Sequence, residues 1–433
     1  MYTIKKLNLN RKKLGLFAAI LFSIGSILGG GIFSLTGIII KISGYYSILG
    51  LFVAFLIILI SAFSYSRLVS FYPYDGGGYL FAKEILGNFW GFISGWGVYI
   101  SACIFIAFVL HVFGLYFSEF FLNSIIPQIY LSLLAFLILI VLAFLNFSES
   151  GWFEGGLVII NILIILIFIL LGIVFYHAGF IEKLKYNHSS DIIAAIGVIF
   201  VSFMGFQSLA NISQEVKNPQ KVIPKAIVIS LSFVLIIYIL LTVVVLSTLN
   251  SGFGVSSVVF SAKKVLGNFF LLIPFAAVVS TLSAANSNII AAQKTIQYMA
   301  KEKQISNKFS RENKKGVPFV ALIFLSIVVI LFLIFTNIVF LVQVASFLVM
   351  FLFILINISS FILSIRKNRG DLKIIELLPL LGVVFTIFVA FYLPLLAFEV
   401  ALILLFIGVM YYELEKRSIM HSIVNFFRVR NAR

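Results

Sequence analysis

Long apolar segments recur from one end of this chain to the other. A helix needs about 20 mostly apolar residues to cross the hydrocarbon core of a membrane, and twelve segments have roughly that length. They lie at about 14–40, 45–70, 88–117, 128–147, 153–177, 192–212, 226–249, 268–299, 318–336, 338–365, 374–392 and 394–413. With 62% apolar and 11% charged residues, the composition excludes a soluble domain. We therefore predict an all-α integral membrane protein with twelve transmembrane helices.

Basic residues are distributed unevenly between the two sides of this predicted membrane. With the N-terminus in the cytoplasm, the cytoplasmic segments hold 26 of the 31 Lys and Arg residues. The opposite side holds only Lys41, Lys183, Lys185, Lys263 and Lys264. By the positive-inside rule, both termini are then cytoplasmic, and the formal net charge of +16 reflects topology. We expect a multi-pass protein of the cytoplasmic membrane, surrounded by lipid, with no nucleic-acid partner.

Three consecutive glycines, Gly29, Gly30 and Gly31, interrupt the middle of the first segment. Glycine costs about 1 kcal/mol relative to alanine in a helix interior, so the helix unwinds there readily. Unwound backbone inside a membrane is tolerated where it lines a cavity or packs against protein, and its free N–H groups form an anion site. Small residues also serve helix packing alone, and Gly25 and Gly29 have that spacing. Packing alone would need small residues on one face of the helix, whereas three adjacent glycines point in three directions. The pattern therefore favours a substrate site.

A second interruption, Ser202–Ser208, lies near the centre of the sixth segment. The first segment opens one group of five and the sixth opens another, so the interrupted helices hold matching places in two halves of opposite orientation. Such a pair is typical of inverted-repeat transporters, with the substrate bound between the interruptions. The predicted organisation is a cytoplasmic N-terminus (1–13), a first repeat with helices 1–5 (14–178), a second repeat with helices 6–10 (192–365), helices 11–12 (374–413) and a cytoplasmic C-terminus (414–433).

Ionisable residues are missing from the middle of every predicted span. A ligand at mid-depth must then find its charge partners in backbone dipoles, which favours a zwitterion over a polyvalent ion. The single cysteine and four scattered histidines indicate neither a metal site nor a cofactor. An enzyme would need converging nucleophiles, bases or ligands, and an ion channel would need a ring of polar pore residues. Neither pattern is found, whereas a substrate sensor without transport activity stays open.

Several short motifs, taken in order, resemble the amino acid-polyamine-organocation superfamily of transporters. They are Gly25-Ser26 with Gly29-Gly30-Gly31-Ile32-Phe33, then Gly76-Gly77-Gly78-Tyr79, Gly87 and Gly95-Trp96, then Gly205-Phe206, Glu215, Asn218-Pro219 and Pro224-Lys225-Ala226-Ile227, and finally Gly316-Val317-Pro318. The resemblance implies a five-plus-five inverted repeat like that of the bacterial leucine transporter, with two further helices. It departs from the usual first motif in having Gly30 in place of the central serine.

The resemblance also implies a substrate site between the two interruptions. The substrate carboxylate would bind N–H groups around Gly29, Gly30 and Gly31, and the interruption of helix 6 would include Gly205. The ammonium would meet carbonyl groups near Ser26, Ile27, Phe203 and Met204. An aromatic residue, Phe203 or Phe200, would close over the substrate, although either could instead be one of the chain's many lipid-facing phenylalanines.

Energy coupling is the least determined property. Many proton-coupled members have a lysine in helix 5 where Asn161 stands, and some carriers of cationic substrates have a glutamate where Gln207 stands. Ser280, Thr281 and Ser283 resemble hydroxyls that line the sodium site of the leucine-transporter fold, although such hydroxyls also bond within their own helix. Proton coupling, sodium coupling and amino acid exchange stay open as alternatives. We predict a secondary active transporter of neutral amino acids that works by alternating access.

Overall fold

The computed structural model describes residues 13–29, 31–146, 151–174, 192–249, 251–368 and 373–431. These residues form helices and connecting turns and contain no strand beyond an isolated bridge between Leu14 and Val216. Gly30 and most of the predicted N-terminal segment 1–13 lie outside the described residues, as do 175–178 and 432–433.

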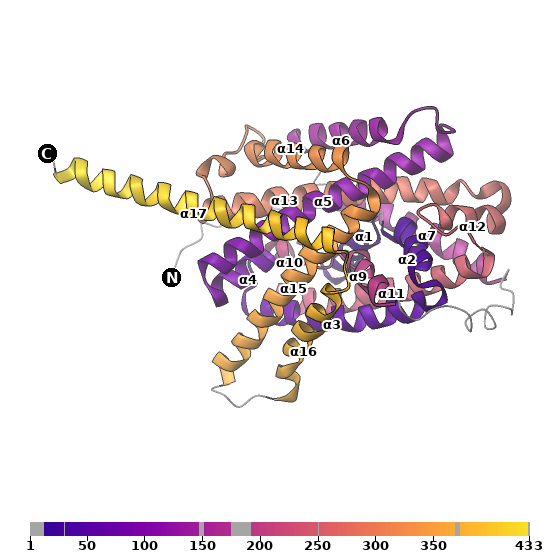
Figure 1. Cartoon of the computed structure of the whole chain (residues 1–433), viewed down its shortest axis with the longest axis horizontal. Helices are drawn as coiled ribbons and strands as arrows, with labels where there is room; N and C mark the ends of the chain where they lie inside the picture. The colour runs from indigo at the N-terminus through magenta and orange to yellow at the C-terminus, as the bar shows by residue number, and fades with distance from the viewer. Residues whose placement is uncertain are drawn as a thin grey trace.

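Helices occur in each of the twelve predicted segments. The first five segments contain α1 (Leu16–Leu28), α2 (Gly31–Ser43), α3 (Ser47–Phe71), α4 (Gly77–Leu86), α5 (Asn88–Phe121), α6 (Gln128–Phe144) and α7 (Gly151–Val174) and their connections. The next five contain α9 (Ile192–Ser202), α10 (Ser208–Asn211), α11 (Pro219–Thr248), α12 (Ser257–Leu266), α13 (Leu272–Lys301), α14 (Phe319–Phe335) and α15 (Ile338–Asn368) and their connections. The last two are α16 (Ile374–Ala390) and α17 (Leu395–Asn431), and α17 extends past the other helices (Figure 1).

Among the described residues, seven helical stretches are long and apolar enough to cross a membrane. One of them, Gly31–Phe71, combines α2 and α3. Five shorter apolar helices are α1, α6, α9, α14 and α16. Of these, α1 and α9 are parts of the two interrupted segments, which break after Leu28 and after Ser202, where the sequence predicted.

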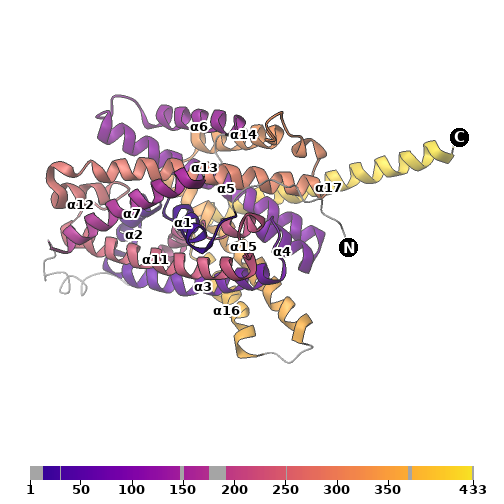
Figure 2. The same cartoon turned by 180° about the vertical axis from the view of Figure 1, so that it is seen from behind.

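The two groups of helices pack in matching ways. The first helix of each half packs against the second helix of the other half: α1 packs against α11, and α9 packs against α3. In the same way, the third helix of each half packs against the fifth helix of the other: α13 packs against α7, and α5 packs against α15. α3 pairs with α11, and α5 lies beside α13 through the middle of the bundle (Figures 1 and 2). α4 follows the second segment, and α12 follows the seventh. α12 lies between two predicted spans, 226–249 and 268–299, where the sequence predicted no helix.

Burial separates central helices from peripheral ones. In α5, 89% of the most apolar 18-residue window is buried, against 33% in α7 and 22% in α17. α5 is therefore enclosed by protein, whereas α7 and α17 expose broad apolar surfaces. The interruptions in α1–α2 and α9–α10 lie among the central helices, away from those surfaces.

Candidate functional site

The two interruptions meet backbone to backbone at Gly205 and Ser26. Gly205 has φ of +121°, and a methyl group there would lie 2.3 Å from the carbonyl oxygen of Ser26 and 2.8 Å from the amide nitrogen of Ile27. Both the backbone angle and the lack of space require glycine. The structure thus brings together the predicted ammonium-binding carbonyl of Ser26 and the interruption after α9.

The glycines after α1 face two other helices. A methyl group at Gly29 would lie 2.9 Å from Cβ of Ala284 in α13, and one at Gly31 would lie 3.1 Å from the hydroxyl of Tyr238 in α11. That hydroxyl donates a hydrogen bond to the carbonyl of Ser202, the last residue of α9 (3.2 Å). Tyr238 therefore links the start of α2 to the end of α9. Gly30 lies outside the described residues.

Phe200 and Phe203 are both 1% exposed. Phe203 contacts the rings of Phe55 and Tyr238, with centroids 6.3 and 5.7 Å apart, and Phe200 contacts Phe353. The burial rules out the alternative that these two phenylalanines face lipid. Phe203 is the one next to Tyr238 and hence nearer to the start of α2.

Ser26 carries a polar atom that the fold leaves without a partner. Its side chain is 2% exposed, and its Oγ has no hydrogen-bond partner among the described residues. A buried hydroxyl without a partner costs free energy unless a ligand or water supplies the bond. Ser202 Oγ, at the end of α9, is another buried hydroxyl without a partner among the described residues.

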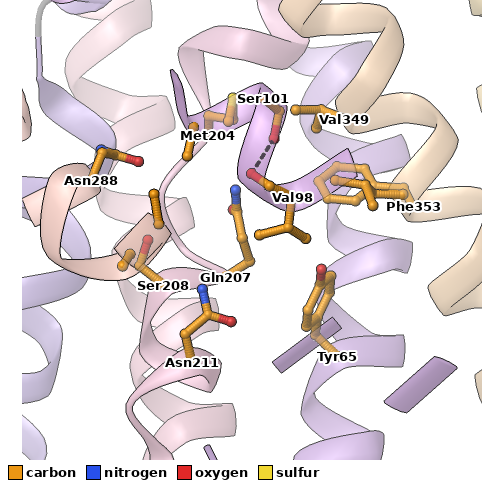
Figure 3. A pocket seen from close by; sticks show the side chains of 14 residues that line it. Tyr65, Val98, Ser101, Met204, Gln207, Ser208, Asn211, Asn288, Val349 and Phe353 are labelled. Carbon is orange, nitrogen blue, oxygen red and sulfur yellow. Dashed lines mark hydrogen bonds between the residues drawn. The ribbon is translucent and has the colours of Figure 1, made fainter. Parts of the chain in front are cut away.

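A cavity lies beside the second interruption, and Met204 is the one predicted site residue that lines it (Figure 3). Its other lining residues come from α3, α5, α10, α13 and α15 and from Gln207, the residue before α10. None of the lining residues is Asp, Glu, Lys, Arg or His. The polar ones are Tyr65, Ser101, Gln207, Ser208, Asn211 and Asn288.

Gln207 connects this cavity to the interruption. Its Oε1 accepts a hydrogen bond from the backbone N–H of Gly205 (3.0 Å), and its side chain lies among the lining residues in Figure 3. Asn288 donates to the carbonyl of Ala284 in its own helix (2.8 Å). Sequence reasoning noted Gln207 only as a departure from glutamate and missed Asn211, Asn288 and Tyr65, because no local pattern places these distant residues around one space.

The candidate coupling residues separate into two groups. Ser280 Oγ donates to the carbonyl of Gly29 (3.0 Å), so α13 contacts the first interruption directly. Thr281 Oγ1 instead donates a hydrogen bond to the carbonyl of Val278 in its own helix (2.8 Å). Ser283 is half-buried. Asn161 is 5% exposed in α7, which packs against α1.

The end of the bundle that contains α4 is closed around residues 213–217; we call it the α4 end. Leu14 N–H donates to the Glu215 carbonyl (2.8 Å), and Lys217 N–H donates to the Leu14 carbonyl (2.9 Å). Gln214 N–H donates to Asp75 Oδ1 (2.9 Å), and Lys294 pairs with Glu215 (2.7 Å). Burial raises the pKa of Asp75, and the charge of Glu215 adds to this, whereas Gln214 and Lys294 oppose it.

The opposite end, which contains α12, is closed by different contacts; we call it the α12 end. The buried hydroxyl of Tyr116 in α5 lies 3.0 Å from the carbonyl of Phe33 in α2 and 2.9 Å from that of Val255, just before α12. Ser256 Oγ donates to Glu119 Oε2 (2.9 Å). A methyl group at Gly37 would lie 1.9 Å from the carbonyl oxygen of Gly254, so α2 and this turn touch through their backbones.

The part of the chain that the structure describes contains no group of three or more His, Cys, Asp or Glu side chains able to hold a metal ion. The groups that the described residues present at the interruptions are backbone N–H and carbonyl groups, hydroxyls and aromatic rings.

Several known transporters are similar to this chain in sequence. A branched-chain amino acid permease of Lactococcus lactis subsp. cremoris is 24% identical, with 84% of this chain and 86% of the relative covered. A methylthioribose transporter of Bacillus subtilis is 28% identical over 54% of each chain. An uncharacterised transporter of Mycobacterium tuberculosis is 25% identical over 94% of this chain and 92% of the relative. The model of the amino acid permease family matches residues 14–411, so this multi-pass membrane protein belongs to that family of transporters.

Proposed function

We propose that the protein is a secondary active transporter that moves neutral amino acids across the cytoplasmic membrane by alternating access. The observation that carries this proposal is the contact between the two interruptions, where Gly205 lies on the carbonyl of Ser26 beside a cavity without charged side chains. Interrupted helices in matching places of two halves are the arrangement in which transporters bind small ions and zwitterions.

The substrate is placed by its two charges. Its carboxylate binds N–H groups of Gly29, Gly30 and Gly31, the last of which begins α2, where the helix dipole favours an anion. In this structure the N–H of Gly29 donates to the Gly25 carbonyl (3.5 Å), so it must be released when the carboxylate binds. Its ammonium binds backbone carbonyls near the interruptions, and the unpartnered hydroxyl of Ser26 supports a polar ligand there. The carbonyls are those of Ser26, Ile27, Phe203 and Met204, with Phe203 or Phe200 closing over the substrate.

The cavity supports a neutral side chain. A charged group buried among Tyr65, Gln207 and Asn288 would lack a counter-ion, and such burial is costly. Neutral hydrogen-bonding groups, or apolar groups against Met204 and Phe353, match the chemistry of this lining. The cavity has a volume of about 20 Å³ in this structure, enough for a water molecule, so a side chain enters it only when the surrounding helices separate. One relative is named for branched-chain amino acids and another for methylthioribose, so an uncharged polar molecule is a second candidate substrate.

The exchange of packing partners between the two groups of helices supports a five-plus-five inverted repeat. Each half contributes an interrupted first helix, and α4 and α12 hold matching places after the second helix of each half. The repeat requires twelve spans with both termini on one side. The excess of Lys and Arg makes that side, and hence the α4 end, cytoplasmic.

Three modes of energy coupling stay as alternatives. Asn161 cannot titrate, so a proton would need another carrier. The hydrogen bond from Ser280 Oγ to the Gly29 carbonyl brings α13 into contact with the first interruption, which supports sodium coupling through these two oxygen atoms as one alternative. Exchange of one amino acid for another requires no ion site, and a sensor of the same fold would bind the substrate without transporting it.

A ligand screen followed by uptake tests the proposal. The purified protein is heated with each standard amino acid and with methylthioribose, and a ligand at about 100 times its Kd adds about 2.7 kcal/mol of stability. Uptake of the stabilising compound into vesicles is then measured under a pH gradient, a sodium gradient or an internal amino acid load. Stabilisation by neutral amino acids with uptake supports the proposal. Stabilisation without uptake under any of the three conditions indicates a sensor, and stabilisation by methylthioribose alone contradicts the amino acid assignment.

A further inference from the structure

The two ends of the bundle differ in the charged contacts that close them. The α4 end is held by an ion pair, by a carboxylate-bound amide and by the two backbone hydrogen bonds of Leu14 around residues 213–217. The α12 end is held by the buried hydroxyl of Tyr116 and by close backbone packing of Gly37 on Gly254. Salt screens exposed charges and leaves neutral, buried contacts almost unchanged.

The ion pair at the α4 end lies directly next to the cavity. Glu215 follows Asn211, a lining residue at the end of α10, by four positions, and Lys294 follows the lining residue Ala291 by less than one turn of α13. The pair therefore joins the two walls of the cavity on the side of the α4 end. Separating those walls requires the pair to break.

Exposure makes this pair accessible to dissolved ions. The side chain of Lys294 is 34% exposed and that of Glu215 is 43% exposed, although their atoms approach to 2.7 Å. Asp75 brings a second carboxylate close to the same lysine, and the structure gives it a backbone N–H, not a cation, as its bonding partner. The electrostatic attraction at the α4 end thus depends on the ammonium group of Lys294, which is partly exposed to solvent and interacts with the carboxylates of Glu215 and Asp75.

The contacts at the α12 end include no ion pair among the described residues. Tyr116 is fully buried, and it bonds backbone carbonyls of Phe33 and Val255. Glu119 is the charged residue in this closure, and its partner there is the neutral hydroxyl of Ser256. Raising the salt concentration is therefore expected to weaken one closure and to leave the other in place.

We infer that ionic strength at the α4 end regulates this protein, by setting how often the Lys294–Glu215 pair opens and the cavity becomes accessible from that side. The inference rests on the proposed function only in naming the α4 end cytoplasmic. Access to the cavity can be measured without any transport, so the regulation by ionic strength and the proposed transport function can be tested, and can fail, independently.

The test measures labelling of a single cysteine in the cavity wall. Ala291→Cys in a Cys103→Ala background is treated with a soluble maleimide, while KCl is raised from about 0.01 M to about 1 M, which shortens the Debye length from about 30 Å to about 3 Å. We expect labelling to become about two to five times faster, in line with the small contribution of an exposed pair. A cysteine at Thr36, near the α12 end, should not be labelled faster.

Charge-removing variants identify the pair responsible. Glu215→Gln and Lys294→Met should each give fast labelling at low salt and little further response to KCl. Glu312→Gln is the matched control, because Glu312 pairs with the exposed Lys301 (3.5 Å) away from the cavity lining, and it should keep the full response. A rate independent of KCl, an equal response in Glu215→Gln, or the same acceleration by sucrose of equal osmolality would each overturn the inference.

Discussion

The backbone of Gly205 lies directly against the carbonyl group of Ser26, so two helix interruptions about 180 residues apart in sequence share one contact. The contact leaves no room for either backbone to move toward the other. We expect a ligand that binds the end of α1 to act also on the segment between α9 and α10.

Gly205→Ala tests this contact. The added methyl group would lie 2.3 Å from the Ser26 carbonyl, and the φ of +121° disfavours alanine, so we expect a lower unfolding temperature and loss of substrate binding. Gly156→Ala is the control, because a methyl group there meets no atom within 4 Å. Thermal unfolding and ligand titration measure both effects. Normal binding by Gly205→Ala would refute the assigned site.

Tyr116→Phe tests the closure at the α12 end. Removing the hydroxyl leaves the carbonyls of Phe33 and Val255 without their buried donor, so we expect this end to open more often. The measurement is the labelling rate of a cysteine at Thr36, which is 1% exposed, by a membrane-impermeant maleimide. A severalfold increase is expected, while Tyr130→Phe, at a 63% exposed position, should change nothing. An unchanged rate in Tyr116→Phe would show that this bond does not hold the closure.

Local sequence was sufficient to predict some of these features and not others. The interruptions at Gly29–Gly31 and after Ser202 were predictable, because glycine lowers helix stability wherever it lies. α12 was missed because its ten residues include two lysines and two serines, which make it too short and too polar to be recognised as a span. Tyr65, Asn211 and Asn288 were missed because their shared cavity depends on how five helices pack, and the need for glycine at position 205 depends on Ser26, far away in the chain.

Ser280→Ala examines the link between α13 and the first interruption. The substitution removes the donor to the Gly29 carbonyl, and we expect a higher KM for uptake, together with loss of any sodium dependence. Thr281→Val is the matched control, since Thr281 bonds only within its own helix in the described structure. Equal effects of the two substitutions on initial uptake rates would argue against a special role for Ser280.

Asp75→Asn gives a prediction about pH. Burial raises the pKa of Asp75 above its ordinary value near 3.8. Ionisation therefore costs more in the folded protein than in the unfolded one, and the wild type loses stability as pH rises from that value through the raised pKa. Asparagine keeps an acceptor for Gln214 N–H without this loss. We expect the variant to be more stable than the wild type at neutral pH and to lose that advantage in acid, as measured by thermal unfolding across pH. A constant difference would contradict the assignment.

Cysteines at Ser310 and Ser251 test the span count. Ser310 lies between α13 and α14, and Ser251 lies between α11 and α12. In a Cys103→Ala background, impermeant reagents should label Ser310→Cys from the cytoplasm and Ser251→Cys from outside. Labelling of both from one side would remove the basis for the inverted repeat.

α7 faces two surroundings at once, and this links the bilayer to the binding region. One side of the helix packs against α1, where a methyl group at Gly25 would lie 2.5 Å from Val158, and only a third of its most apolar window is buried. Membrane helices tilt when the thickness of the surrounding hydrocarbon changes. We therefore expect a thinner or thicker bilayer that tilts α7 to press on α1 one turn before its interruption, which would make acyl-chain length a variable for substrate affinity.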